Sequence, residues 1–309
     1  MKGRSCLILI ALGAWLAAAG ITAENARAFG IRVGPYAWCA WWKPAFEDWM
    51  LRSSFTRRHL SRMRAGYDFK PSILYGPVLT LDFTNRINLT SVFVLGRYRL
   101  RASVAESLTI NNFIFSHPDI SINKYDLDST LNIILNPSFK IFCGFKYQHY
   151  NYSKVDLISI PFYSFQFLAN DTVMYHGVSA GAGAGFIFKL TDSFFLLWNV
   201  SLLYQRPIVI IKQKQYLIIS SNVYPLNERI MPDYNALGVN ATLTFSYVFR
   251  KISTTLALGL RYQYLYTFGN DVRGIDFDKN SDHFYGITLA AVYSYQTVDK
   301  ISGGSTVPR

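Results

Sequence analysis

Acidic side chains in this chain lie at spacings that could support chemistry. Asp126 and Asp128 are two residues apart, and Asp282 directly precedes His283. Paired carboxylates with a histidine nearby can perform general acid–base catalysis, in which they activate a water molecule. Residues two apart on a strand share one face, so the same carboxylates can equally form salt bridges with basic residues of neighbouring strands. These residues are therefore candidates for catalysis or for a structural charge network.

Basic residues at alternate positions would complete such a network. The positions that alternation assigns to one polar, lumen-facing side are Arg32, Asp82, Arg97, Arg99, Asp126, Asp128, Lys140, Lys146 and Arg261. Unpaired charge is costly in a confined interior, so we expect most of these residues to pair across strands. Because the set is net positive, a water-filled path between them would prefer small anions. A packed polar plug and a narrow channel are both compatible with this pattern.

A separate basic segment follows an aromatic run near residue 41. It contains Arg52, Arg57, Arg58, Arg62 and Arg64. The planar guanidinium group binds two oxygen atoms at once, which suits phosphate and carboxylate groups. An exposed loop of this composition could hold lipopolysaccharide phosphates or an anionic glycan, whereas a solvated face or a lumen-folded cap needs no ligand. Nucleic acid is not an expected partner, because the N-terminal features described below indicate export.

Metal, cofactor and nucleotide sites are not indicated. The histidines and cysteines show no ligand spacing for a metal, and Cys39 and Cys143 are isolated residues that we expect to face lipid. One predicted strand carries a row of glycines on a single face, at Gly177, Gly181, Gly183 and Gly185. The row opens no helix and so forms no phosphate-binding loop. It either admits bulky neighbouring groups or lets the sheet curve.

The elements that must position these residues are long β-strands. Apolar and polar residues alternate over about a dozen positions in 194–204, 235–249, 255–268 and 285–296. Strands of soluble proteins average about 5–6 residues, whereas a tilted strand needs about 9–11 to cross a bilayer. Hydrocarbon offers no hydrogen-bond partners, so a membrane sheet must close on itself, with apolar side chains toward lipid and polar ones toward the lumen.

The connections between strands favour the same architecture. Short turns are expected near 84–86, 136–138, 191–193 and 250–253, and long connections near 43–70, 102–118, 155–172, 208–231 and 269–281. The fold class is therefore all-β: a closed antiparallel up-and-down transmembrane β-barrel of about ten strands, with short periplasmic turns and long extracellular loops. The expected strands span 30–41, 71–83, 88–101, 119–135, 139–153, 173–189, 194–207, 234–248, 253–268 and 282–297.

The N-terminus has the features of a cleavable signal peptide. Lys2 and Arg4 precede a short apolar core, and a run of small residues ends at Ala28. Half of the 309 residues are apolar and only 16% are charged, which excludes a disordered chain, and three cysteines exclude a disulfide scaffold. We expect a signal peptide at 1–28, a barrel at 29–298 in the bacterial outer membrane, and a polar tail at 299–309.

One predicted hairpin resembles a known family. It reads KYDLDSTLN at 124–132, NP at 136–137 and KIFCGFKYQ at 140–148. This hairpin resembles one found in uncharacterised Gram-negative outer-membrane β-barrel proteins of the spirochaete type, and it covers two strands of about ten. The resemblance implies an outer-membrane barrel and assigns no activity. Such barrels commonly end at an aromatic residue, whereas here a polar tail follows Tyr295; either the assembly signal is internal or the tail is not native.

These features predict a surface-exposed outer-membrane protein that is structural or adhesive, or a narrow and weakly anion-preferring channel, rather than an enzyme. Its expected partners are outer-membrane lipid and the outer-membrane insertion machinery, with no cofactor. The alternative is a hydrolase similar to the omptins, a family of surface proteases with Asp pairs and an Asp–His pair at the loop-side rim. The residues matching that pattern are Asp126, Asp128, Asp282 and His283, but the expected loop at 208–231 contains neither His nor Asp.

Overall fold

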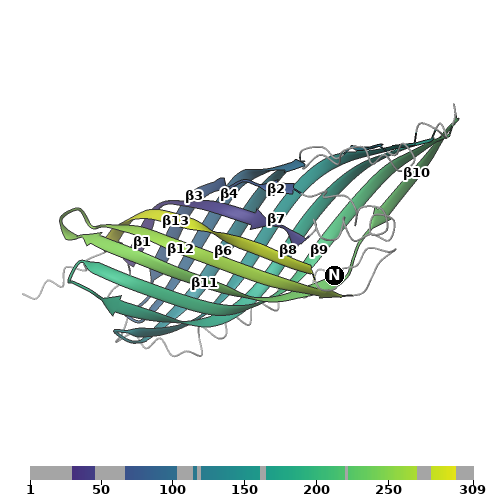
Figure 1. The fold of residues 1–309 in the computed structure, drawn as a ribbon. Helices are drawn as coiled ribbons and strands as arrows, with labels where there is room; N and C mark the ends of the chain where they lie inside the picture. The colour runs from purple at the N-terminus through teal and green to yellow at the C-terminus, as the bar shows by residue number, and fades with distance from the viewer. Residues whose placement is uncertain are drawn as a thin grey trace, which may run out of the picture.

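The computed structural model describes residues 30–45, 67–102, 114–116, 120–160, 165–219, 222–269 and 280–296, and nearly all of them form one antiparallel sheet (Figure 1). Ten strands make a closed barrel. They are β1 (Gly30–Lys43), β3 (Ser72–Asp82), β4 (Ile87–Ala102), β6 (Ile120–Asn136), β7 (Phe139–Ile160), β8 (Phe165–Lys189), β9 (Phe194–Ile219), β11 (Tyr234–Phe249), β12 (Thr254–Gly269) and β13 (Asn280–Gln296). Three shorter strands extend the sheet, namely β2 (Tyr67–Phe69), β5 (Ile114–Ser116) and β10 (Asn222–Ile230).

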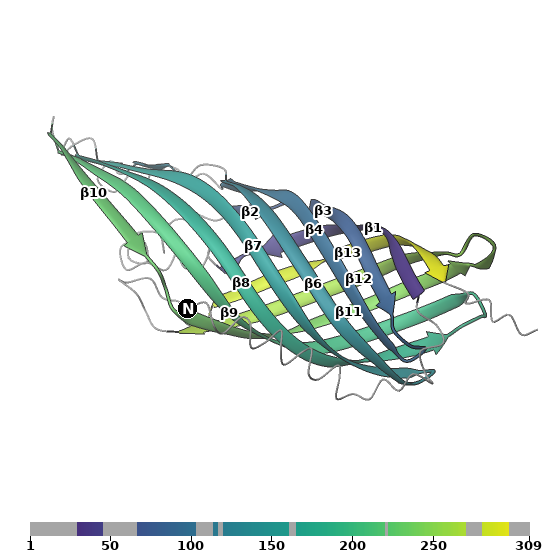
Figure 2. The same ribbon diagram turned by 180° about the vertical axis from the view of Figure 1, so that it is seen from behind.

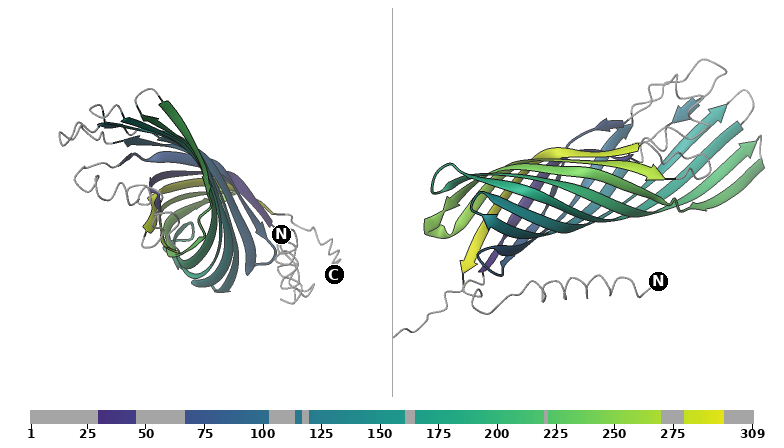
Figure 3. Two further views of the ribbon diagram at one scale, coloured as in Figure 1. Left: turned by 90° about the vertical axis from the view of Figure 1, so that its right-hand side faces the viewer. Right: turned by 90° about the horizontal axis from the view of Figure 1, so that it is seen from below.

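Closure follows from the pairing of the first and last strands. Gly30 of β1 is opposite Gln296 of β13 on one side and opposite Asp82 of β3 on the other. The remaining strands pair with their neighbours in chain order, including β8 between β7 and β9. A view nearly along the barrel shows the strands following one another around the ring (Figure 3, left). In a closed sheet each barrel strand has a partner on both sides, which is the condition that hydrocarbon imposes.

Outward-facing side chains form an apolar belt around the barrel. On β12, Leu256, Leu258 and Leu260 are 42%, 54% and 57% exposed. Aromatic residues border the belt: Tyr295 lies near the short turns, and at the opposite end Trp41 stacks on a neighbouring tyrosine with ring centres 5.6 Å apart. Leucines so exposed would be unfavourable in water but not in lipid. The protein is therefore a transmembrane β-barrel of the bacterial outer membrane.

The short turns lie at one end of the barrel, together with both ends of the described barrel chain. In the turn after β8, Nζ of Lys189 lies 2.6 Å from Oδ1 of Asp192. This hydrogen bond holds the pKa of the Asp192 carboxyl below its usual value. Thr191 Oγ1 accepts hydrogen bonds from two backbone N–H groups of the same turn. Among the described residues, no helix is long and apolar enough to cross a membrane.

The predicted strands agree with the observed ones, except that three are much longer than expected. β7, β8 and β9 contain 22, 25 and 26 residues, and with β10 they rise beyond the rest of the rim (Figures 1 and 2). We call this extension the strand wall; it comprises 152–160, 165–173, 208–219 and β10. The connections predicted at 155–172 and 208–231 are wrong, because most of these residues pair in regular register. Both faces of these strand segments mix polar and apolar residues, so the segments show no regular alternation in the sequence.

Candidate functional site: the barrel lumen

Side chains of the barrel itself fill the outer half of the lumen. Trp42, Tyr98, Tyr150 and Phe284 point inward from four strands, and each is at most 2% exposed. The Trp42 ring stacks on Phe284 with ring centres 5.2 Å apart. Tyr98 and Tyr150 both meet the Trp42 ring edge-on, with ring centres 5.0 Å apart. We call these four residues the aromatic plug; their rings are buried inside the barrel and pack around Trp42.

A buried lysine sits among the rings of the plug. Lys124 of β6 is 1% exposed. Its ammonium group lies between 4.6 and 5.7 Å from the ring centres of Phe284, Trp42 and Tyr150. Nζ also lies 2.8 Å from Oδ1 of Asp126, two residues along the same strand. A charge can be buried here because a carboxylate and three ring faces replace its water.

Between the plug and the short turns, the lumen is lined by polar side chains. Arg261 Nη2 donates to Oδ2 of Asp128 at 2.6 Å, and its Nε donates to Oδ1 of Asn240 at 3.2 Å. Lys146 Nζ donates to Oε1 of Gln263 at 2.6 Å. These groups come from β6, β7, β11 and β12, so the interactions cross the lumen as well as neighbouring strands.

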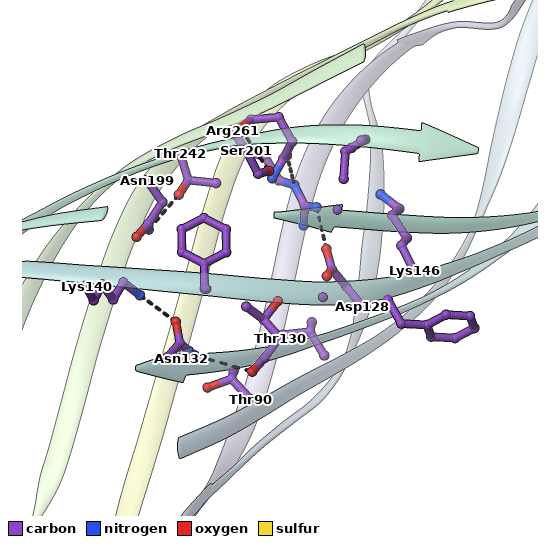
Figure 4. Close-up of a pocket in the computed structure, with 17 residues that line it drawn as sticks. Thr90, Asp128, Thr130, Asn132, Lys140, Lys146, Asn199, Ser201, Thr242 and Arg261 are labelled. Atoms are coloured by element: carbon purple, nitrogen blue, oxygen red, sulfur yellow. Dashed lines mark hydrogen bonds and ion pairs between the residues drawn. The ribbon is translucent and has the colours of Figure 1, made fainter. Parts of the chain in front are cut away.

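The polar half contains a cavity of about 210 Å³ (Figure 4). Its charged lining consists of Asp128, Lys140, Lys146 and Arg261. Three basic residues and one acidic residue give this lining a formal charge of +2. Lys140 donates to Oδ1 of Asn132 at 2.9 Å. A polar, positively charged cavity of this size can hold water and small anions.

Two further predicted network residues pair separately, and two others lie outside the lumen. Arg32 and Asp82 form a two-point interaction at 2.6 and 2.9 Å near the short turns. Arg97 and Arg99, in contrast, are exposed on the outer face of β4, so their assignment to the lumen network is wrong. The inward positions of β4 are the even-numbered ones, such as the fully buried Tyr98. Near the outer end of β4 the outward-facing side chains are charged and the inward-facing ones are apolar. The alternation therefore assigns the wrong set of residues to the lumen at this point.

The carboxylate and histidine considered for hydrolysis do not face each other. Asp282 points into the lumen, where its Oδ1 accepts a hydrogen bond from Trp42 Nε1 at 2.6 Å. Nε2 of His283 lies 2.8 Å from Oγ of Ser281. Adjacent strand residues project from opposite faces, so His283 faces outward while Asp282 faces inward. The two cannot act together on one substrate in the lumen.

Several predicted features lie elsewhere or outside the described residues. The basic segment with its five arginines, the signal peptide and the C-terminal tail all lie outside them. Cys39 and Cys143 are free thiols on outward-facing positions of β1 and β7. Within the described part of the chain, no group of three or more His, Cys, Asp or Glu side chains could hold a metal ion.

The row of glycines on β8 faces the lumen and accommodates bulky neighbours. A Cβ atom at Gly183 would lie 2.1 Å from the carbonyl oxygen of Val200 and 2.7 Å from the ring of Phe142. At Gly185 it would lie 2.8 Å from the side chain of Lys140. The row therefore makes room for side chains of the neighbouring strand β7 and for close approach to β9.

Substituting Gly183 by valine is expected to destabilise the barrel. Because the obstructing atom at 2.1 Å belongs to the backbone of β9, the strands must separate to admit the side chain. Overpacking of this kind costs about 1–3 kcal/mol. The free energy of unfolding, measured by urea titration in phospholipid vesicles, should fall by that amount. Ala182→Val, on the exposed outer face of the same strand, is the matched control and should change little.

Sequence reasoning missed Lys124 and the aromatic plug. The signal for Lys124 was present, because it shares a face with Asp126 and Asp128 at alternate positions. The plug does not follow from the alternation, because the alternation assigns apolar residues to the lipid side. In β13, Phe284 shares the inward face with Asp282, so this face carries both apolar and charged residues.

No protein-family model and no curated protein sequence matches the chain. Among solved structures, it is similar to the outer membrane protease OmpT of Escherichia coli (9% identity, 88% of this chain and 97% of that chain, TM-score 0.41). It is also similar to the toluene transporter TodX of Pseudomonas putida (10% identity, 88% and 89%, TM-score 0.37). A third is the translocator domain of the autotransporter NalP of Neisseria meningitidis (9%, 95% and 99%, TM-score 0.34). At these sequence identities and TM-scores, none of the three activities can be assigned to this chain. The resemblance to spirochaete-type barrel proteins stays a prediction.

Proposed function

We propose that this protein is a surface-exposed outer-membrane barrel with a closed lumen, and that its role is structural or adhesive. The observation that carries the proposal is the aromatic plug, in which Trp42, Tyr98 and Phe284 are 0–1% exposed inside the barrel. A barrel of ten strands is only slightly wider than one of about eight, whose interior side chains already fill it. With its lumen occupied, the protein presents its outer end, and above all the strand wall, as the functional surface.

The closed lumen predicts that the purified protein does not conduct ions. Insertion of the folded protein into planar bilayers should leave the current at the level of the bare membrane across the usual voltage range. Folding is checked independently by the heat-dependent mobility shift that intact barrels show on gels. A steady, stepwise conductance from folded protein would contradict the closed state.

A narrow anion-preferring channel is the second candidate, and the polar cavity favours it. The cavity of about 210 Å³ has a lining of formal charge +2, which would attract small anions from the periplasmic side. Conduction would then require the plug to move. A reversal potential that shifts toward the chloride equilibrium potential in a salt gradient would identify this activity.

A hydrolase similar to the omptins finds little support in the geometry, because Asp282 and His283 project from opposite faces of β13. Asp128 is bonded to Arg261 at 2.6 Å and is not a free base. The partners we propose are outer-membrane lipid and the insertion machinery, which every barrel of this type needs, and an anionic glycan or lipopolysaccharide for the arginine-rich segment at 52–64.

A further inference from the structure

The outward face of the strand wall carries only basic charge at its described positions. Lys212 and Lys214 lie two residues apart on β9, and Arg229 of β10 is directly opposite Lys212. All three side chains are exposed. Like charges at directly opposed positions of a sheet repel each other, so this arrangement is unfavourable unless an anion is nearby.

The acidic residues of the same wall lie on its inward face, where Lys154 of β7 is also directly opposite Asp171 of β8. Asp171 of β8 and Glu228 of β10 are both directly opposite Gln213, one on each side of β9. Asp171 is 6% exposed and Glu228 is half-buried. A sheet that needs charge only for solubility would mix both signs on each face. The outward face carries basic charge alone, which indicates that it meets something anionic.

The basic face continues the lipid-facing strip of the barrel. On β9, Leu202, Tyr204 and Ile208 are 65%, 48% and 52% exposed on the same side as Lys212. The outward Arg206 lies between Tyr204 and Ile208 and pairs with Asp233. Lys212 follows Ile208 by four residues. At about 3.3 Å per residue and the usual strand tilt, the basic residues stand roughly 10 Å above Ile208. This is the level of lipid headgroups rather than of acyl chains.

We propose that Lys212, Lys214 and Arg229 bind phosphate groups on the saccharide headgroup of lipopolysaccharide in the outer leaflet. Both neighbours on β8, Asn170 and Thr172, are uncharged and lie opposite the two lysines. The lysines supply point charges and the arginine supplies a planar pair of donors, a combination that suits clustered phosphates. The site would hold the wall against the membrane surface, and it would do so whether or not the lumen conducts.

The test compares the wild-type protein with the K212Q/K214Q/R229Q variant in vesicles of increasing lipopolysaccharide content. A second set of vesicles contains the same lipopolysaccharide after removal of its phosphates. The unfolding temperature, read from the heat-dependent gel shift, reports binding. Each basic residue near an anionic surface contributes about five-fold, so the triple variant should lose about 100-fold in apparent affinity. Added salt should weaken the wild-type response.

The control variant is K189Q/R250Q/K251Q, which removes three exposed positive charges from the periplasmic turns. It should respond to lipopolysaccharide as the wild type does. The proposal is overturned if the wall variant keeps the wild-type response, if dephosphorylated lipopolysaccharide stabilises equally well, or if millimolar inorganic phosphate reproduces the effect. Should the triple variant not fold, K214Q alone serves, with an expected loss of about five-fold.

Discussion

Replacing Trp42 and Phe284 by alanine is expected to convert a closed barrel into a conducting one. These two stacked rings fill the lumen and cover Lys124, whose ammonium lies 4.6 Å from the Phe284 ring and 5.1 Å from that of Trp42. Without them, the path from the outer end passes Lys124, Asp126 and Asp282 and reaches the cavity, whose lining has a formal charge of +2. Planar-bilayer recordings should then show discrete current steps, with anions preferred over cations.

The variant is also expected to be less stable, since each buried ring replaced by alanine costs about 3–5 kcal/mol. The barrel hydrogen bonds are unchanged, so the protein should still fold in lipid. The matched control is Trp41→Ala/Tyr285→Ala, which removes a stacked aromatic pair from adjacent positions on the same two strands but on the lipid side. The control should remain closed. A W42A/F284A protein that folds and passes no current would show that the plug is not the barrier.

Removing one member of the Arg261–Asp128 pair is expected to lower the stability of the barrel strongly. The guanidinium lies 2.6 Å from the carboxylate, and the Arg261 side chain is only 10% exposed. Arg261→Met leaves Asp128 in a confined interior without its cation, which costs about 3–5 kcal/mol. Urea titration of the barrel in vesicles should show this loss in the free energy of unfolding.

The double variant R261M/D128L should recover most of that loss, because it leaves no uncompensated charge. The comparison pair is Arg32–Asp82, whose closest N–O distance is also 2.6 Å but whose side chains are 40% and 26% exposed. Arg32→Met should cost about 1 kcal/mol or less, since water replaces the lost partner. Equal losses at the two sites would mean that burial does not govern the strength of these pairs.

The barrel could be predicted from sequence because lipid imposes a strict pattern on its outer surface. In β12 the leucines at 256, 258 and 260 must all face outward, and a shift by one residue would place Arg261 in hydrocarbon. The same constraint locates Asp128, Lys140 and Lys146 in the lumen, where the structure brings them around one cavity.

The strand wall and the plug could not be predicted in this way, because neither faces hydrocarbon. Above the hydrocarbon region, Lys212 and Lys214 face outward beside Gln213 and Gln215, so both faces of β9 are polar. Inside the barrel, aromatic and charged residues are equally acceptable if each is packed or paired. Trp42 and Lys124 come together from β1 and β6, and no local spacing in the sequence records that contact.

The uneven rim has a consequence for neighbouring molecules in a crowded membrane. Along Asn222–Ile230, β10 pairs with β9 on one side, and among the described residues no strand continues the sheet on its other side. An exposed edge strand of this kind can pair with the edge strand of another copy, which leads to strand exchange or fibre growth. Two residues of β10 hinder such pairing: Pro225 has no N–H to donate, and Arg229 is charged. The protein thus extends a sheet into the exterior while discouraging its own polymerisation.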